Sequence, residues 1–203
     1  MSTEGIDVAW PQGAHFPWEF QKDKIAFGMC KATEGTGLAD PDFAPNWDAM
    51  WWLRPDHRLP RFAYHFFRPN LDPAAQAAYF VARVKAHGLM PGDNLVMDLE
   101  VDDGLDHAAV AARGTEFLRH VNELAPGHRV LVYTFVSFAE AGNCAGMDPW
   151  YLWIADYGVS RPAVPAPWSQ WTFWQNGDSP QDTDVFNGDG AALLAFCRMP
   201  DRR

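Results

Sequence analysis

Two acidic residues, Asp98 and Glu100, are separated by a single leucine at the end of an apolar run. In an extended strand, side chains at positions i and i+2 point to the same side, about 6.6–7 Å apart along the chain. Carboxylates this close do not both ionise freely, so one keeps its proton and can act as a general acid near neutral pH. Glycosidic bond cleavage uses this chemistry, because an acid protonates the leaving oxygen while a second carboxylate stabilises the cationic centre.

Further acids and aromatic residues follow the other apolar runs of the chain, each at or just after the point where a strand would end. These residues are Asp7, Lys31, Glu34, Tyr64, His65, Tyr133, Thr134, Trp153, Asp156, Tyr157, Trp174, Gln175 and Asp184. A D-x-E pattern alone occurs by chance in many chains, whereas a ring of carboxylates interleaved with aromatic rings is typical of a cleft that binds sugar rings. The pattern predicts a glycan-cleaving site.

The elements that must position these side chains alternate between strands and helices. The predicted strands are 5–8, 25–32, 62–66, 95–99, 130–134, 151–155, 172–175 and 184–186. They are apolar nearly throughout, as in parallel strands buried on both faces. The predicted helices are 41–53, a segment after Asp72-Pro73 that ends at Gly88, and a segment after Asp106 that ends before Pro126-Gly127; after Thr134 helices become short or absent.

This alternation predicts an α/β protein with a parallel sheet. The chain contains neither G-x-G-x-x-G nor G-x-x-x-x-G-K-[ST], which disfavours a nucleotide-binding doubly wound sheet. We therefore expect a TIM-like (β/α) barrel of eight mostly parallel strands, with its site at the carboxyl ends of the strands. A length of 203 residues fits one catalytic domain over 1–203.

Composition excludes several classes of partner. A net charge of −10 disfavours nucleic acid, and no apolar run approaches the ~18 residues of a membrane span. The seven His form no H-E-x-x-H and no zinc-spaced cluster, so we expect no metal and no cofactor. We also expect a monomer. Three cysteines, Cys30, Cys144 and Cys197, are interpreted as small buried residues, although one pair could form a disulfide.

The first seven residues lack the basic start and apolar stretch of a signal peptide. We therefore expect that the protein is released by a phage-type route, or that a leader segment was removed from it earlier.

Eight short motifs occur in order along the chain. They are Gly5-Ile6-Asp7-Val8 with Gln12-Gly13, Lys31-Ala32-Thr33-Glu34-Gly35, Ala63-Tyr64-His65-Phe66, Met97-Asp98-Leu99-Glu100, Tyr133-Thr134, Leu152-Trp153-Ile154-Ala155-Asp156-Tyr157, Phe173-Trp174-Gln175 and Asp184-Val185-Phe186-Asn187-Gly188. Each is weak alone, but the ordered set, from Gly5 to about Phe196, resembles glycoside hydrolase family 25. Members of this family are lysozymes that act as N-acetylmuramidases, often phage endolysins or bacterial autolysins.

The resemblance implies a modified barrel with fewer than eight regular helices, whose substrate is bacterial peptidoglycan. The bond cut would be the β-1,4 linkage between N-acetylmuramic acid and N-acetylglucosamine. Glu100 matches the general acid and Asp98 the residue that assists at the anomeric side. Asp7 and Asp184 match acids that support this pair. The expected substrate-binding residues are Glu34, Tyr64, Tyr133, Trp153, Asp156 and Gln175.

Several points stay open at this stage. Ala9-Trp10-Pro11 departs from the small polar residue that often follows Asp-Val in the family, which alters the cleft rim. Lys31 is expected to pair with Glu34 or with another acid. Side-by-side carboxylates favour a mechanism in which the substrate's acetamido group is the nucleophile, while a far-face base, Asp7 or Asp184, would give inversion.

Two other functions compete with a muramidase. The first is a barrel that binds glycan without cutting it, against which the intact Asp98 and Glu100 argue. The second is a chitinase-like N-acetylglucosaminidase, but the D-x-x-D-x-D-x-E run typical of that class is absent.

Overall fold

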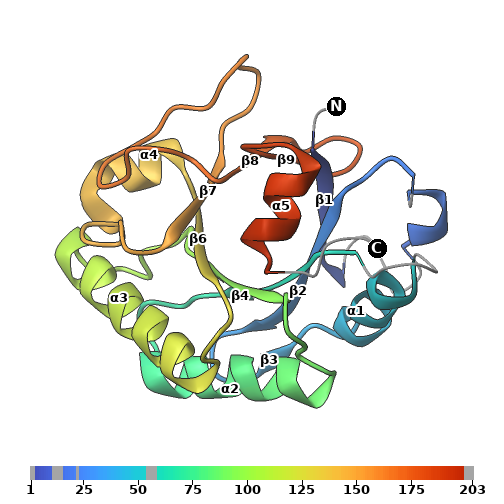
Figure 1. The fold of residues 1–203 in the computed structure, drawn as a ribbon. Helices are drawn as coiled ribbons and strands as arrows, with labels where there is room; N and C mark the ends of the chain where they lie inside the picture. Colours follow the sequence, from blue (N-terminus) through green and yellow to red (C-terminus); the bar gives the residue numbers. More distant parts are fainter. Residues whose placement is uncertain (1–2, 11–15, 22, 54–58, 199–203) are drawn as a thin grey trace.

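Eight strands form a closed barrel in the computed structural model of the chain, which describes residues 3–10, 16–21, 23–53 and 59–198 (Figure 1). The strands are β1 (Glu4–Val8), β2 (Phe27–Glu34), β4 (Arg61–Phe66), β5 (Asn94–Asp98), β6 (Val130–Phe135), β7 (Tyr151–Ala155), β8 (Phe173–Gly177) and β9 (Thr183–Phe186). All eight predicted strands are present, and the predicted fold is confirmed. The structure adds a two-residue strand, β3 (Leu38–Ala39), which pairs with β2.

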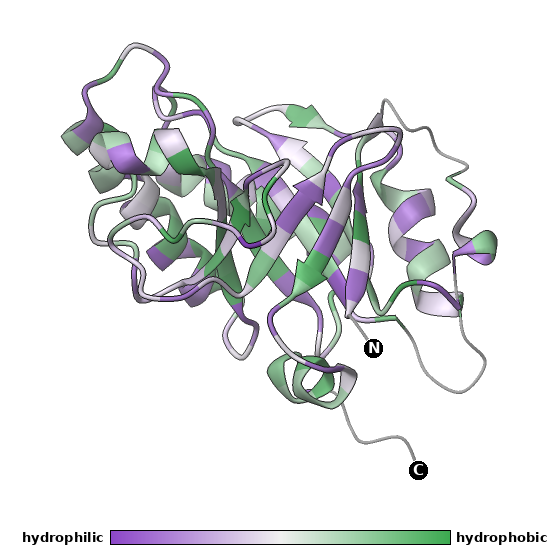
Figure 2. Ribbon diagram, turned by 90° about the horizontal axis from the view of Figure 1, so that it is seen from above, coloured by the Kyte–Doolittle hydropathy of each residue, from purple (hydrophilic) through white to green (hydrophobic). Residues whose placement is uncertain are grey.

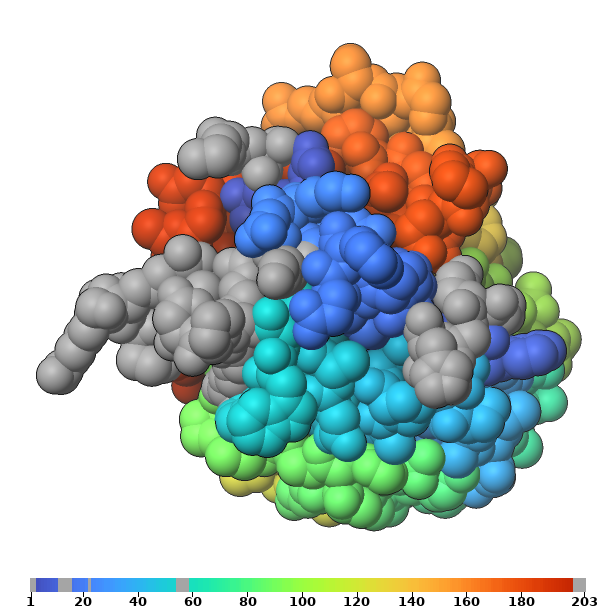
Figure 3. All heavy atoms as spheres, turned by 90° about the vertical axis from the view of Figure 1, so that its right-hand side faces the viewer, coloured from blue at the N-terminus to red at the C-terminus, as the bar shows by residue number. Residues whose placement is uncertain are grey.

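The strand directions explain how the barrel closes. Strands β1, β2, β4, β5, β6, β7 and β8 run parallel to their neighbours, and β9 runs antiparallel to both β8 and β1. The amino end of β9 therefore lies beside the carboxyl ends of the other strands. Figure 3 shows the result at the surface, where blue segments from the start of the chain lie beside orange and red segments from its end.

The predicted helices are also present, with the predicted caps. They are α1 (Phe43–Trp52), α2 (Pro73–Ala86) and α3 (His107–Leu124). Asp72 and Asp106 each accept a hydrogen bond from a backbone N–H of the first helical turn, at 2.7 and 2.8 Å, and Gly88 follows α2 with φ +79°. Smaller helical elements that the sequence patterns did not predict are η2 (Trp18–Phe20), α4 (Val136–Phe138), the π-turn Ala139–Asn143 and α5 (Gly190–Phe196).

Helix α5 covers the end of the barrel opposite the carboxyl ends of the parallel strands. It lies across the barrel in Figure 1 and is coloured hydrophobic in Figure 2. Phe196 packs edge-on against Tyr151 and Phe173, at the amino ends of β7 and β8, with ring centroids 4.8 and 5.7 Å apart. Aromatic rings such as Phe27 fill the interior of the barrel beyond α5. The Phe27 ring lies so close to Gly5 that a Cβ atom on residue 5 would be 2.3 Å from it.

The cysteine prediction is confirmed, because Cys30, Cys144 and Cys197 are buried and the described residues contain no disulfide. Within the ranges described, no helix combines the length and the apolarity that crossing a membrane requires. The motif residues Gln12-Gly13, together with Pro11 and the first two residues used in the signal-peptide interpretation, lie outside the described part of the chain.

A buried ion pair connects α1 and α2 to the start of two strands. Arg61, the first residue of β4, donates to Asp93 through Nε and through a terminal nitrogen, at 3.0 and 2.5 Å. It also donates to the carbonyls of Trp47 and Gly88, at 2.9 and 3.2 Å, and its guanidinium stacks 3.9 Å from the Trp47 ring centroid. The side chains of Arg61 and Asp93 are both buried, so loss of one charge leaves the other uncompensated.

We predict that Arg61→Met lowers the free energy of unfolding by about 3–5 kcal/mol, because Asp93 would lose the guanidinium that neutralises it. Urea denaturation measures this change. Arg119→Met on the exposed side of α3 is the matched control, with an expected effect within about 0.5 kcal/mol. A loss for Arg61→Met no larger than that of the control would contradict the interpretation.

Candidate active site

A cavity of about 190 Å³ opens at the carboxyl ends of the parallel strands. Its lining residues are Asp7, Tyr64, Asp98, Glu100, Tyr133, Trp153, Tyr157, Gln175 and Asp182. They come from β1, β4, β5, β6, β7, β8 and the segments next to them. The barrel therefore brings together acids and aromatic rings that are far apart in sequence.

Gln175 lies at the centre of the hydrogen-bond network in this cavity. Its Nε2 donates to Asp7 Oδ2 at 2.7 Å, and its Oε1 accepts from the hydroxyl of Tyr133 at 2.8 Å and from the hydroxyl of Tyr157. Gln175 is buried, so these three partners fix its orientation. The amide thus presents its only N–H₂ group to Asp7 and holds that carboxyl in place.

Asp7 and Asp184 form a buried carboxyl pair. Asp184 Oδ1 accepts a 2.8 Å hydrogen bond from Trp153 Nε1, while Asp184 Oδ2 receives no protein N–H. The charges of the two side chains interact, and a proton on one of them relieves their repulsion. Burial, and then the charge of Asp182, raises the pKa of Asp7 to about 7; burial and Asp7 raise the pKa of Asp184 well above its usual range.

Asp98 and Glu100 form the second carboxyl pair. Asp98 is the last residue of β5, and the backbone continues in register because Leu99 N donates to Tyr133 O at 2.9 Å. Both side chains line the same cavity, and their charges interact. Burial, and then the charge of Glu100, raises the pKa of Asp98 well above its usual range, and burial also raises the pKa of Glu100. The pair can therefore hold a proton that a substrate could receive.

The aromatic residues give the cavity rigid walls. Trp153 packs at a tilt against Tyr133, with ring centroids 4.4 Å apart, and contacts Tyr64 edge-on at 6.2 Å. Tyr64 donates its hydroxyl to Val8 O at 3.3 Å, so it ties β4 to β1 directly behind Asp7. These rings can contact the apolar face of a sugar while the acids contact its polar groups.

Three of the predicted site residues lie elsewhere. Asp184 lies beneath the cavity, outside its lining. Glu34 does not line the cavity either; it pairs with Lys31 at 2.9 Å and with Arg68 at 3.7 Å. The predicted pairing of Lys31 with Glu34 is thus confirmed, and it directs Glu34 toward these cations. Asp156 lines an adjoining cavity.

Two lining residues had no catalytic or binding role assigned from the sequence, although Tyr157 was noted at a strand end. Tyr157 follows β7 and reaches back to Gln175, and Asp182 comes from the segment before β9. Burial, and then Asp178, raises the pKa of Asp182 to about 6. The signal for Asp182 is its place two residues before Asp184, on the same side of an extended chain. Trp10, at the unusual position after Asp-Val, is 60% exposed, and its backbone N–H donates to Asp40.

His65 is a structural residue. Its Nδ1 lies 2.8 Å from the hydroxyl of Thr33, its Nε2 lies 3.2 Å from Gln76 Oε1, and its ring stacks on Phe117 with centroids 5.0 Å apart. Burial lowers the pKa of His65 to about 3, so the imidazole stays neutral near pH 7. The acids are therefore the groups that can exchange protons in the cavity.

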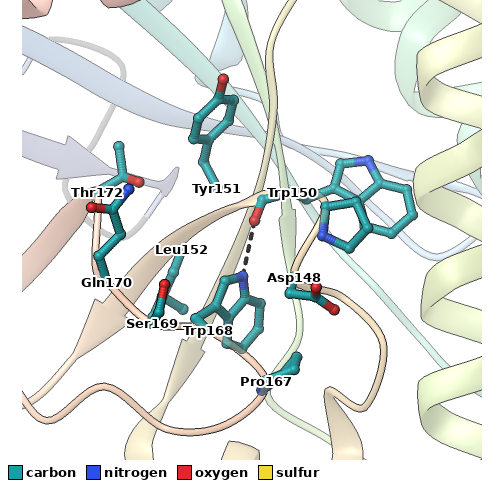
Figure 4. Close-up of a pocket in the computed structure, with 10 residues that line it drawn as sticks. Asp148, Trp150, Tyr151, Leu152, Pro167, Trp168, Ser169, Gln170 and Thr172 are labelled. Carbon is teal, nitrogen blue, oxygen red and sulfur yellow. Dashed lines mark hydrogen bonds between the residues drawn. The ribbon is translucent and has the colours of Figure 1, made fainter.

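A second cavity lies at the opposite end of the strands, where Tyr151 begins β7 and Thr172 precedes β8 (Figure 4). Its volume is about 290 Å³, and Trp168 Nε1 donates to Trp150 O across its floor at 2.9 Å. It contains one carboxylate, Asp148, and no acid pair, so it lacks the chemistry of the first cavity. In the part of the chain described, no group of His, Cys, Asp or Glu is arranged to hold a metal ion.

We predict that Asp184→Asn stabilises the protein at pH 8 by at least about 1 kcal/mol, because the amide would donate to Asp7 where Asp184 Oδ2 has no donor. The folded-state pKa of Asp184 is raised, so the native state binds more protons than the unfolded state and loses stability as pH rises. The difference in the free energy of unfolding between the variant and the wild type should therefore fall toward zero near pH 4. Denaturation curves at both pH values, with Asp148→Asn as control, test this; a gap independent of pH would refute it.

Comparison with known proteins agrees with the sequence motifs. The model of the family Glycosyl hydrolases family 25 matches residues 6–185. Lysozyme M1 of Streptomyces globisporus is 32% identical, over 96% of this chain and 71% of its own length. The uncharacterized protein YegX of Escherichia coli is 31% identical over 85% of this chain, which spans only 63% of the length of YegX. The bacterial lysozyme from Streptomyces coelicolor has a TM-score of 0.85 and 31% identity, over 97% of each chain. Because the family model covers most of the residues and the ordered motifs agree with it, this chain belongs to glycosyl hydrolases family 25.

Proposed function

We propose that this chain is a peptidoglycan hydrolase that cuts the β-1,4 bond between N-acetylmuramic acid and N-acetylglucosamine, with Glu100 as general acid. Family membership makes it a glycoside hydrolase of the lysozyme class, whose place of action is the bacterial cell wall. The observation that carries the proposed roles is the placement of the Asp98 and Glu100 carboxyls side by side in the acid-lined cavity. One chain supplies every lining residue, so a monomer suffices.

The first step uses the proton of the carboxyl pair. Glu100 is less buried than Asp98 and lies past the end of β5, which suits the residue that reaches the leaving oxygen. As Glu100 donates its proton, the bond between the anomeric carbon and the leaving oxygen breaks. The oxygen of the substrate's own acetamido group then bonds to the anomeric carbon from the other face.

Asp98 stabilises the charge that develops in this step. Its Oδ1 is buried and receives no N–H from the protein, so the acetamido N–H of the substrate would supply the missing donor. A water molecule then attacks the anomeric carbon, displaces the acetamido oxygen and gives a proton to Glu100, which restores both the acetamido group and the enzyme. Asp7 also lines the cavity and is the remaining candidate for a far-face base, but its Oδ2 already accepts a hydrogen bond from Gln175.

Glu100→Gln should reduce cell-wall lysis by roughly 10²–10⁴-fold, because the isosteric amide cannot give a proton to the leaving oxygen. Turbidity loss of purified peptidoglycan measures the rate. Glu140→Gln, an exposed residue of the π-turn, is the matched control and should lyse walls at the wild-type rate. If Glu100→Gln retained more than a tenth of the wild-type activity, Glu100 would not be the general acid.

The products provide a second test. New reducing ends should lie on N-acetylmuramic acid, and no stem peptide should be released, because the cavity holds carboxyl groups suited to glycosidic bonds. Borohydride reduction followed by sugar analysis decides this; glucosaminitol alone would contradict the proposal. Nuclear magnetic resonance of the first product adds the stereochemistry, since a β-anomer supports the acetamido mechanism and an α-anomer supports a far-face base.

A further inference from the structure

The second cavity, at the amino ends of β7 and β8, lies at the other end of the barrel from the acid-lined cavity (Figure 4). Two segments line it: residues 148–152, which lead into β7, and residues 167–170 with Thr172, which lead into β8. Its volume of about 290 Å³ exceeds the 190 Å³ of the acid-lined cavity. The proposed reaction uses none of these residues, so it does not explain the second cavity.

Hydrogen bonds between the two segments fix the shape of the second cavity. Trp168 Nε1 donates to Trp150 O at 2.9 Å, and Thr172 N donates to Leu152 O at 2.8 Å. Within its own segment, Trp168 N donates to Pro165 O at 3.2 Å. The Trp168 side chain is buried, so its ring is held as part of the floor. A ligand would therefore meet a preformed site and would not have to order these segments.

Four polar side chains of the lining form no hydrogen bond or ion pair with any described residue. They are Asp148, Ser169, Gln170 and Thr172. Figure 4 shows Gln170 and Thr172 on one side of Trp168 and Asp148 on the other. Together they offer one carboxylate, two hydroxyl groups and one primary amide around the indole ring. The second cavity thus holds donors and acceptors that the protein itself does not use.

The chemistry of this lining favours a neutral ligand with many hydroxyl groups. The lining residues include no Lys, Arg or His, so no cation there attracts an anion. Among the described residues that line the cavity, Asp148 is the only acid, so a metal ion would lack a set of ligands. Trp168 adds an apolar surface, on which one face of a sugar ring can pack while its hydroxyl groups bond to the polar side chains.

The charge of Asp148 distinguishes between the two sugars of the wall glycan. N-acetylmuramic acid carries a lactyl group that ends in a carboxylate or in the stem peptide, whereas N-acetylglucosamine is neutral. Asp148 would repel a second carboxylate. Arg129, which contacts the Tyr151 ring, already donates to the Tyr151 hydroxyl and to the Phe196 carbonyl. We propose that the second cavity is a non-catalytic site that binds N-acetylglucosamine units of the wall glycan.

A binding site at this end of the barrel would hold the enzyme on the wall while the acid-lined cavity acts on another part of the glycan. Strands β7 and β8 separate the two cavities, so one sugar cannot contact both. Binding at two points raises the effective concentration of substrate at the catalytic site. This role in retention rests on the proposed function, whereas the binding of sugar can be measured without it.

The first test is a titration of the isotope-labelled wild-type protein with two monosaccharides, N-acetylglucosamine and N-acetylmuramic acid. Nuclear magnetic resonance follows the indole N–H groups, of which Trp168 reports on the second cavity and Trp153 on the acid-lined cavity. We expect N-acetylglucosamine to shift the Trp168 signal saturably. Its dissociation constant there should be lower than that of N-acetylmuramic acid by roughly threefold or more, because only the latter meets the charge of Asp148.

Variants of exposed lining residues locate the sugar. Gln170→Ala should weaken the binding seen at Trp168 by roughly threefold or more, because an amide donor and acceptor are lost. Asp148→Asn should remove the discrimination between the two sugars, because the amide keeps an acceptor oxygen and loses the charge. Asp48→Asn, exposed on α1, is the matched control and should change neither result.

The second test measures the role in retention. On insoluble peptidoglycan, Gln170→Ala should act roughly threefold or more slowly than the wild type, because one of two attachment points is weakened. On a soluble wall oligosaccharide the two proteins should have the same kcat/KM within about twofold, because Gln170 does not line the acid-lined cavity.

Each other outcome has a defined meaning. A Trp168 signal that does not respond to N-acetylglucosamine would overturn the inference, as would equal binding by the wild type and by Gln170→Ala. Tighter binding of N-acetylmuramic acid would overturn the choice of sugar, and equal rates of both proteins on insoluble peptidoglycan would overturn the role in retention. If the wild-type protein cut neither substrate, the proposed function would fail, and the titration would still decide whether the second cavity binds sugar.

Discussion

The buried acids at the barrel mouth must share very few hydrogen-bond donors, and this constraint governs the site. Gln175 gives its N–H₂ group to Asp7, and Trp153 gives its N–H to Asp184, which leaves one Asp184 oxygen without a donor. A carboxyl that cannot find a donor retains its proton, so burial raises the pKa of this pair. The same physics acts on Asp98 and Glu100, which keeps an acid available for chemistry near neutral pH.

Most of the fold could be predicted because the local patterns and the packing agree. The apolar runs 62–66 and 95–99 become adjacent parallel strands, and the caps at Asp72 and Asp106 begin α2 and α3 as expected. Helix α5 was not predicted because tertiary contacts, and not local sequence signals, stabilise it. It has only seven residues, and it is held by distant groups, such as Arg129, which donates to the carbonyl of Phe196.

The site was predictable to the extent that strand ends define it. Asp7, Asp98 and Gln175 reach the cavity because a parallel barrel brings the carboxyl ends of its strands to one mouth. Glu34 also stands at a strand end, yet Lys31 and Arg68 hold it, which no spacing rule reveals. Asp182 comes from the segment before β9, and its place depends on β9 running antiparallel, a fact that strand-end reasoning does not contain.

The net charge of −10 bears on the proposed function, because the bacterial cell wall that would be the substrate is itself anionic. At physiological ionic strength charges are screened over about 8 Å, so the repulsion between the whole protein and the wall is short-ranged. Inside the cavity the raised pKa values of Asp7, Asp98 and Asp184 keep part of the carboxyl groups neutral, which lowers the local negative charge. Recognition can then depend on Trp153, Tyr64 and hydrogen bonds at short range, where attraction between opposite charges is not needed. The protons retained by these carboxyl groups thus have two effects. They supply an acid for catalysis, and they reduce the electrostatic repulsion between the cavity and an anionic polymer.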